Sequence, residues 1–184
     1  MMARIVGLSG SLRRASFNTA LLHAAARLLP AGSTLEIADI RGVPLYDGDV
    51  EAAGVPPAVA ALKAQVARAD GLLIATPEYN HAMPGVLKNA IDWMSRPPQE
   101  PPVFLRRPVA VIGAAPSPFG TARAQPSLLP VLRALRTRVF SDALPLYVTH
   151  ADKAFDAQGQ LVDATHRERL AAFLTDFLAF IART

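Results

Sequence analysis

Polar side chains gather directly after a short apolar run near the N-terminus, in segment 9–19 (SGSLRRASFNT). Its small residues let backbone N–H groups point into a concavity, while several hydroxyls, the Arg13 guanidinium and the Asn18 amide add side-chain donors. If this segment opens a helix, the partial positive charge of the helix N-terminus strengthens anion binding. The residue types therefore favour a phosphate dianion as ligand. The simpler interpretation is a Ser/Asn helix cap.

Segment 9–19 lacks two known phosphate-binding patterns, and their absence limits which phosphate ligands it could bind. No Gly-Lys-Ser/Thr sequence follows it, as a Walker loop requires, and no Gly-x-Gly-x-x-Gly pattern occurs in it, as a dinucleotide-binding turn requires. We therefore expect a mononucleotide phosphate rather than ATP or a Rossmann-type pyrophosphate.

A second segment, 76–85 (TPEYNHAMPG), has residues suited to a planar ring. Pro77 and Tyr79 can form an apolar and aromatic wall, and the exposed peptides around Glu78 and Asn80 can reach a polar ring edge. The alternative is an ordinary loop in which Glu78 caps a helix and Tyr79 enters the core. His81, next to this segment's ring wall, is a candidate for contact with substrate.

A third segment, 113–120 (GAAPSPFG), is rich in glycine and proline and could close over the far side of a ring, although its composition is a weak signal. Other chemistry has less support. The four histidines have no metal-ligand spacing with acidic residues, and no Ser-His-Asp constellation or Gly-x-Ser-x-Gly elbow occurs. We therefore predict no metal site and no hydrolase-type catalytic triad.

The rest of the chain supplies a frame that would bring these three segments together. Short apolar runs alternate with helical periodicity, which predicts a doubly wound α/β fold with a parallel sheet, formed by one domain over residues 1–184. In such sheets ligands bind at the carboxyl ends of the strands, where all three segments lie. The expected strands are 4–8, 34–38, 71–75, 109–112 and 144–148, and the clearest helical stripes are 17–28, 59–66, 84–95 and 170–181.

One helix has an uncertain start. Segment 121–139 contains Pro126 and Pro130, which a helix beginning near Pro126 would tolerate in its first turns, whereas a helix beginning at Thr121 would kink.

Two motifs now stand out together: GSLRRASFN at 10–18 and PEYNHAMPGVLKNAIDWMSRP at 77–97. On these motifs the chain resembles the NADPH-dependent FMN reductase family, a flavodoxin-like group that includes chromate, quinone and azo-dye reductases. Segments 44–47 and 154–156 also look like the family. The resemblance is strong over residues 5–97 and weaker towards the C-terminus.

The resemblance implies a flavodoxin-like five-stranded parallel sheet of order 2-1-3-4-5 with helices on both faces. It implies FMN with its phosphate in the first segment and its ring against the second, and NADPH or NADH as electron donor. The third segment departs from the family, since relatives often carry hydroxyl or glycine residues there. The candidate cofactor-binding residues are Ser9, Ser11, Arg13, Ser16, Phe17, Asn18, Pro77, Glu78, Tyr79, Asn80, Ala115 and Ser117.

The activity expected from the resemblance is an FMN-dependent NAD(P)H oxidoreductase that reduces quinones, chromate, azo compounds or flavins by ping-pong hydride transfer. Because FMN does the chemistry in such an enzyme, we expect no residue to act as a catalytic acid or base. Two alternatives share the fold: an electron carrier or sensor without NAD(P)H turnover, and a regulatory module that has lost the flavin. Flavodoxin-type carriers tend to be strongly acidic, whereas this chain has 19 Lys and Arg against 15 Asp and Glu, a net charge of +4. The charge balance therefore favours the enzyme.

Composition also limits location and partners. There is no cysteine, no apolar stretch near the ~20 residues that cross a bilayer, and no signal-peptide pattern, so we expect a cytoplasmic protein without membrane contact. The arginines are dispersed rather than clustered on one helix face, which argues against nucleic acid as a partner.

The apolar surface expected on helix 84–95 indicates a homodimer or homotetramer. One of its stripes suits burial on the sheet, and Val86 and Trp93 extend the apolar surface to its flank, where a second copy could cover them. The alternative is that a neighbouring helix of the same chain covers Trp93. Related reductases are dimers or tetramers with flavin near the interface, which favours association.

Overall fold

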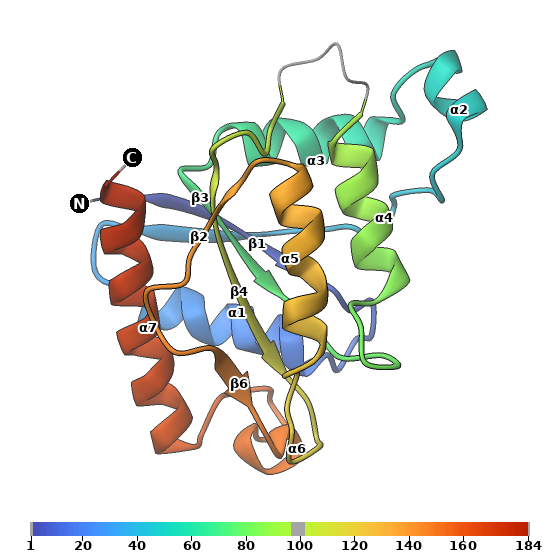
Figure 1. The fold of residues 1–184 in the computed structure, drawn as a ribbon. Helices are drawn as coiled ribbons and strands as arrows, with labels where there is room; N and C mark the ends of the chain where they lie inside the picture. The colour runs from blue at the N-terminus through green and yellow to red at the C-terminus, as the bar shows by residue number, and fades with distance from the viewer. Residues whose placement is uncertain (1, 97–101, 184) are drawn as a thin grey trace.

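The parallel sheet at the centre of the molecule orders its strands as the flavodoxin-like resemblance implies. In the computed structural model, which describes residues 2–96 and 102–183, the order is β2-β1-β3-β4-β5, with β6 also paired to β4. The predicted sheet order is confirmed (Figure 1). The strands are β1 (Arg4–Ser9), β2 (Thr34–Ala38), β3 (Gly71–Ala75), β4 (Pro108–Ala114), β5 (Arg138–Val139) and β6 (Leu146–Val148).

The outermost strand is divided into two pieces, a feature that the sequence did not predict. β5 aligns Val139 with Val109, and β6 aligns Leu146 with Ile112, so both pieces lie along the same edge of β4. From Val109 to Ile112, β4 is shorter than the segment from Val139 to Leu146 that runs beside it. The residues between β5 and β6 must therefore loop out of the sheet. The predicted strand 144–148 is therefore shorter than expected, and its Pro145, which has no N–H to donate to a ladder, lies outside it.

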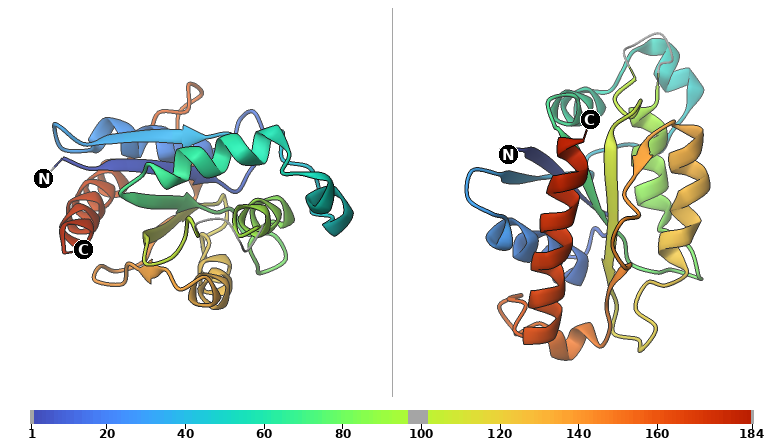
Figure 2. Two further views of the ribbon diagram at one scale, coloured as in Figure 1. Left: turned by 90° about the horizontal axis from the view of Figure 1, so that it is seen from above. Right: turned by 60° about the vertical axis from the view of Figure 1, so that its left-hand side comes forward.

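Helices cover both faces of the sheet, and each face has its own buried apolar cluster (Figure 2). On one face α1 and α7 pack around Leu22 and Phe177. On the other, α3, α4 and α5 pack around Ile91 and Leu128. The four predicted stripes form α1, α3, α4 and α7. The helices are α1 (Phe17–Leu28), α2 (Gly48–Ala53), α3 (Pro57–Ala67), α4 (Gly85–Met94), α5 (Ala124–Ala134), α6 (Ala151–Ala154) and α7 (Ala164–Ala182).

Helix α5 begins between the two starts that its prolines left open. Arg123 is its N-cap residue, so Pro126 lies in the first turn, where its missing N–H costs no intrahelical hydrogen bond. Pro130 lies inside the helix and removes one such bond.

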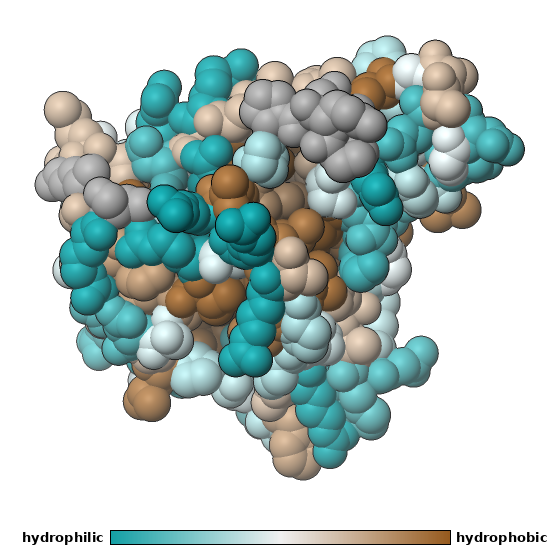
Figure 3. Space-filling model, turned by 45° about the horizontal axis from the view of Figure 1, so that its top comes forward, coloured by the Kyte–Doolittle hydropathy of each residue, from teal (hydrophilic) through white to brown (hydrophobic). Residues whose placement is uncertain are grey.

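A segment between β2 and α3 carries the short helix α2 away from the sheet (Figure 1). No residue of α2 is buried, and in Figure 3 this lobe, at the upper right, shows hydrophobic residues among hydrophilic ones. Its base is anchored to α4: the Trp93 indole N–H donates to the Pro44 carbonyl at 2.9 Å, and the Trp93 ring meets the Tyr46 ring edge-on at 5.0 Å. Trp93 is fully buried by its own chain.

The burial of Trp93 removes one of the two residues on which the predicted oligomer was based. We expected this side chain to require either a second copy or a neighbouring helix, and the chain instead covers it with the loop that follows β2. Val86 does stay on the surface, with 37% of its area exposed. No helix among the described residues is long and apolar enough to span a bilayer.

Candidate functional site

Three loops meet at the carboxyl edge of the sheet, after β1, β3 and β4, and hydrogen bonds join them directly. The Gly10 N–H donates to the Ala75 carbonyl at 2.8 Å, which links the first loop to the end of β3. A Cβ at Gly10 would lie 3.1 Å from the Pro77 side chain, so glycine permits the close approach of the first loop to the second. The predicted convergence of the three segments is therefore observed.

The hydroxyls of the first loop organise the start of α1. Ser16 is the N-cap, and its Oγ accepts the N–H of Thr19 at 3.2 Å. The Ser11 Oγ accepts the N–H of Arg13 at 3.3 Å, and the Ser9 hydroxyl bonds to the Thr19 hydroxyl at 2.8 Å. Because Ser11 and Ser16 act as acceptors in these bonds, each keeps its O–H as a donor for a ligand. The Ser9 hydroxyl is instead already bonded to Thr19 of α1 and lies 3.5 Å from the Ser11 carbonyl, so it has partners within the protein.

The remaining donors of the first loop fit a phosphate group. In the described part of the chain, the backbone N–H groups of Phe17 and Asn18 have no hydrogen-bond partner, as is usual in the first turn of a helix. The Arg13 side chain is exposed and, among the described residues, forms no ion pair. Two hydroxyl donors, two N–H donors and one guanidinium thus lie within one loop, at the positive end of α1. The residues present fit the phosphate of FMN.

Asn18 has a different position from the one its residue type suggested. Its side chain is buried, with Nδ2 donating to the Ala114 carbonyl and Oδ1 accepting the Ala114 N–H, both at 2.9 Å. These two bonds join the first loop to the end of β4. The side-chain amide therefore positions the loops, and the backbone N–H of Asn18 is the group left for a ligand.

The second loop is a tight turn that presents Tyr79 at the surface. Asn80 and His81 both have positive φ, of 49° and 65°, and Tyr79 and Ala82 exchange two backbone hydrogen bonds of 3.0 Å. This is the pattern of a primed hairpin turn, which Asn tolerates better than most residues. Pro77 is buried, while Tyr79 is 48% exposed, so the alternative that places Tyr79 in the core is wrong. An exposed ring beside Pro77 fits the predicted wall for a planar ligand.

The Glu78 carboxylate caps α5. Its Oε2 accepts the N–H groups of Arg123 at 2.9 Å and Ala124 at 3.1 Å, and its Oε1 lies 3.4 Å from Nδ1 of His81. Desolvation by itself raises the pKa of Glu78, but the two N–H donors and His81 outweigh it and hold the pKa below the usual 4.5. The capping alternative is therefore correct for this side chain, which leaves the peptide of Glu78 as the group that a ligand could contact.

His81 stands at the rim of this loop, exposed to solvent. The Arg123 guanidinium approaches its ring, with Nη1 2.8 Å from Nδ1, so the pair forms a polar corner beside Tyr79. No sequence pattern predicted that Arg123 would lie beside His81. Among the described residues there is no cluster of three His, Asp or Glu that could hold a metal ion.

The third loop is packed on β6 and α6. The Ala115 N–H donates to the Val148 carbonyl at 3.0 Å, and the Ala115 carbonyl accepts the N–H of Ala151 at 3.1 Å. The Ser117 hydroxyl bonds within the loop, to the Gly120 carbonyl at 3.4 Å. Both predicted ligands from this loop therefore have backbone or side-chain partners of their own, while Phe119 is 74% exposed at its tip.

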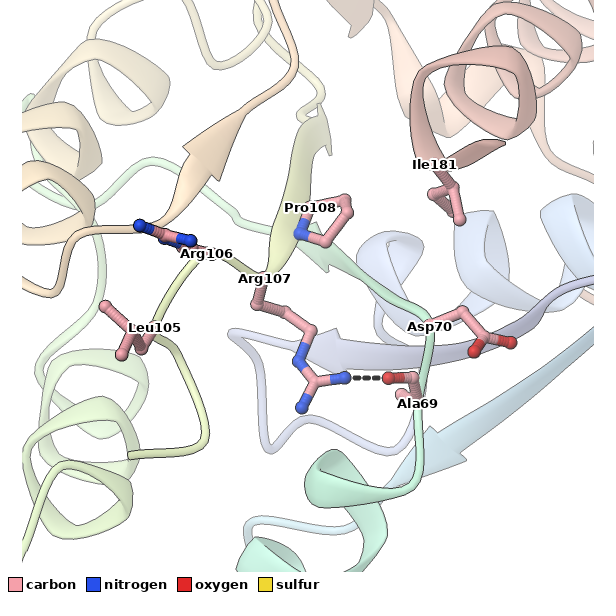
Figure 4. Close-up of a pocket in the computed structure, with 7 residues that line it drawn as sticks. All are labelled: Ala69, Asp70, Leu105, Arg106, Arg107, Pro108 and Ile181. Carbon is pink, nitrogen blue, oxygen red and sulfur yellow. Dashed lines mark hydrogen bonds between the residues drawn. The ribbon is translucent and has the colours of Figure 1, made fainter. Parts of the chain in front are cut away.

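A cavity of about 390 Å³ lies at the opposite, amino edge of the sheet (Figure 4). Arg107 lies beside it and is half-buried, and its guanidinium donates to the Ala69 carbonyl and to the Ala67 carbonyl at the end of α3. Burial lowers the pKa of Arg107, partly offset by the nearby Asp70 carboxylate. This arginine is committed to the helix end, and the cavity is far from the three loops in the fold. We place the functional site at the carboxyl edge.

The chain matches the NADPH-dependent FMN reductase family over residues 3–150. The chain belongs to this family. Both family motifs lie inside the match, although Pro97, the last residue of the second motif, is outside the described residues. The predicted membership of this family is confirmed. The predicted activity, an FMN-dependent oxidoreductase that uses NAD(P)H, is the activity for which the family is named and is confirmed with it.

Individual relatives agree with the family assignment. An NAD(P)H-dependent FMN reductase from Pseudomonas aeruginosa is 48% identical over 185 residues, covering 98% of this chain and 96% of its own. A 2-hydroxy-1,4-benzoquinone reductase from a Burkholderia species is 42% identical, covering 98% and 97%. Among solved structures, the flavoenzyme NAD(P)H:(acceptor) oxidoreductase from Paracoccus denitrificans superposes with a TM-score of 0.88 at 32% identity, covering 98% of each chain.

Proposed function

We propose that the chain is one flavodoxin-like domain, residues 1–184, that binds FMN and uses NADPH or NADH to reduce small acceptors, quinones first among them. The observation that carries the proposal is the set of free donors at the start of α1, from Ser11, Arg13, Ser16 and the first-turn N–H groups. Relatives named as quinone reductases support the acceptor class.

Bound FMN would supply the redox chemistry, accepting a hydride from the donor and passing electrons to the acceptor. The chain's own residues bind and orient. The first loop would hold the phosphate, Pro77 and Tyr79 would flank the ring, and the peptides from Glu78 to Asn80 would face its polar edge. The bonds among the three loops fix these groups before any ligand arrives, which reduces the entropy lost on binding.

The test has two steps. Titration of the flavin-free protein with FMN should quench flavin fluorescence, and stopped-flow mixing of the FMN-loaded protein with NADPH or NADH under anaerobic conditions should bleach the flavin. Absence of FMN binding would overturn the proposal. FMN binding without bleaching by either donor would establish the electron carrier or sensor instead.

The acceptor is tested separately, by steady-state turnover on a panel of a quinone, chromate, an azo dye and free FMN. We expect kcat/KM to be highest for the quinone. A higher value for chromate or for the dye would overturn the quinone assignment and leave the flavin chemistry standing.

We also propose that the protein is a homodimer or homotetramer in solution. With Trp93 covered by its own chain, the support comes from the lobe around α2, where Leu45 is 83% exposed and Val50 40% exposed, together with Val86 on α4. Sedimentation equilibrium of the FMN-loaded protein at micromolar concentration tests it. The mass of one 19.6 kDa chain would refute association.

A further inference from the structure

The outer edge of the sheet has a gap between its two short strands. β5 pairs with β4 as far as Val109, and β6 resumes the pairing at Ile112. Among the described residues, Ala110 and Val111 therefore have no strand partner on this edge, and Val111 is half-buried whereas every other residue of β4 is buried. A pocket of about 240 Å³ lies over Val111, lined from one side by α5 and from the other by α7, which flank this edge (Figure 2).

The lining of the pocket is mostly apolar and carries no charge. Its rings come from Phe140 after β5, Tyr147 of β6 and Phe173 of α7, and Phe140 meets Phe173 edge-on with centroids 5.2 Å apart. Leu129 and Val139 extend the apolar wall. None of the described residues that line the pocket is Asp, Glu, Lys, Arg or His. An ion would lose its hydration here without compensation, so a ligand of this pocket has to be neutral.

One polar atom of the lining is fixed as a hydrogen-bond acceptor. Gln125 is 7% exposed, and its Nε2 donates to the Leu146 carbonyl at 2.9 Å and to the Thr121 hydroxyl at 3.1 Å. Because the Leu146 carbonyl can only accept, the amide nitrogen of Gln125 must face it, which settles which amide atom is the oxygen. Within the described chain Oε1 of Gln125 has no hydrogen-bond partner. A carbonyl oxygen left unpaired in an apolar pocket favours a ligand that donates to it.

The volume of the pocket limits the ligand to about one ring. An apolar cavity of about 150 Å³ holds benzene, so a pocket of about 240 Å³ accommodates a six-membered ring with one or two small substituents. Pockets for larger, drug-sized ligands begin at about 300 Å³. The hydroxyls of Ser141 and Tyr147 belong to the lining and form no hydrogen bond with the rest of the described chain, so they are available to a second substituent.

We propose that this pocket binds a neutral, one-ring aromatic alcohol, whose ring lies against Phe140 and Phe173 and whose hydroxyl donates to Oε1 of Gln125. The inference goes beyond the proposed function, because none of the lining residues is among the groups assigned to FMN. The pocket is nevertheless linked to the flavin edge. Thr121, the bonded neighbour of Gln125, packs against Gly113 at the start of the third loop and leaves no room there for a Cβ. A bound phenol would therefore touch the side chain that ties α5 to this loop.

The probe is 4-fluorophenol, titrated at pH 7 into the FMN-loaded protein and observed by fluorine NMR. Ala143→Phe should block the pocket, because Ala143 is half-buried in its lining and the new ring would occupy the space of the ligand. Ala134→Phe is the matched control, since Ala134 is exposed at the end of α5 and does not line the pocket. We expect Kd to rise at least about tenfold in Ala143→Phe and to stay unchanged in Ala134→Phe. Leu129→Trp, on the α5 wall, is a second blocking variant in case Ala143→Phe does not fold.

Two further compounds test the chemistry of the lining. In 4-fluoroanisole a methyl group replaces the hydroxyl hydrogen, so the compound cannot donate to Gln125 and should bind at least about threefold more weakly. In 4-hydroxybenzoate a carboxylate joins the ring and the hydroxyl, and this compound should compete at least about tenfold more weakly than the phenol, because no cation lines the pocket.

The proposal is wrong if the wild type does not bind the phenol, if the blocking variants bind it as tightly as Ala134→Phe, or if either further compound binds as well as the phenol. A change in flavin absorption that persists in the blocking variants would place the phenol over the flavin and would also overturn it. A lower mass of Ala143→Phe than of Ala134→Phe in sedimentation equilibrium would identify a second copy of the chain as the occupant instead. A protein that binds the phenol but not FMN would refute the proposed function and leave this proposal standing. Thermal melting of each variant establishes that it is folded.

Discussion

Replacing Asn18 by alanine should destabilise the protein strongly, because the side chain holds two loops together inside the molecule. Asn18 is 3% exposed and Ala114 2% exposed, so water cannot take over the two bonds of 2.9 Å that join them. Leaving a buried donor or acceptor unpaired costs about 1–3 kcal/mol for each group. With one N–H and one C=O orphaned at Ala114, we expect a loss of about 3 kcal/mol in the free energy of unfolding, or about 6–12 °C in Tm.

The assay is urea unfolding of the flavin-free protein, since bound FMN would add stability by mass action and obscure the difference. The sequence offers a matched control in Asn89. Its side chain also makes two bonds to backbone, accepting the Tyr46 N–H at 2.8 Å and donating to the Pro44 carbonyl at 2.7 Å, but at a solvent-exposed place. Water can replace those partners, so Asn89→Ala should cost about 1 kcal/mol or less.

Equal losses in Asn18→Ala and Asn89→Ala, or a loss below about 1 kcal/mol in Asn18→Ala, would refute the reasoning from burial. The same variant separates two roles of Asn18. Its backbone N–H survives the substitution, so FMN affinity should fall less in Asn18→Ala than in Arg13→Ala. A larger fall would mean that the side-chain amide contacts the cofactor.

Three further predictions concern single contacts. Arg13→Ala should weaken FMN binding by more than about 1 kcal/mol by removing a charged donor, measured by fluorescence titration with Arg68→Ala as control; an unchanged Kd contradicts it. Glu78→Gln should lower Tm at pH 7. Because the pKa of Glu78 in the folded protein lies below 4.5, the higher Tm of the wild type should persist above pH 4.5 and disappear as the pH falls through the lowered pKa. A Tm difference that stays constant down to pH 3 contradicts this prediction. Trp93→Phe should cost about 1 kcal/mol by removing the bond to Pro44 and should speed proteolysis of the lobe around α2; unchanged cleavage contradicts it.

The sheet and its main helices could be predicted because each carries a long periodic signal. The stripes of α1 and α7 repeat over several turns, and the buried strands are almost continuously apolar. β5 is two residues long and α2 is a six-residue helix with no buried face, so neither has a pattern to detect. Their positions depend on pairing with β4 and on the anchor at Trp93, which are tertiary contacts.

The site could be predicted as a place but only partly as a set of contacts. Residue types located the three loops, because strand ends in a parallel sheet converge. They could not say which polar atoms would be used within the protein: Asn18 pairs with Ala114 and Glu78 with the start of α5, across separations of 96 and 45 residues. The cleft between α1 and the turn 156–160 was missed for the same reason, since Arg14 and Arg27 become neighbours of that turn only in the folded chain.

The polar groups at the carboxyl edge thus divide into those that fix the loops and those left for ligands. Asn18 and Glu78 each hold one loop to another element through backbone partners, and the N–H of Met83 adds a bond of 3.0 Å to Ser127 on α5. Because these bonds are internal, they hold Arg13, Tyr79 and the start of α1 in place without cofactor. A flavin enzyme has to set the distance between two successive ligands and one ring, and a rigid edge sets it before either ligand binds. Ligand binding then depends on the free groups at this edge, which is why we expect Arg13→Ala to weaken FMN binding while Asn18→Ala lowers stability.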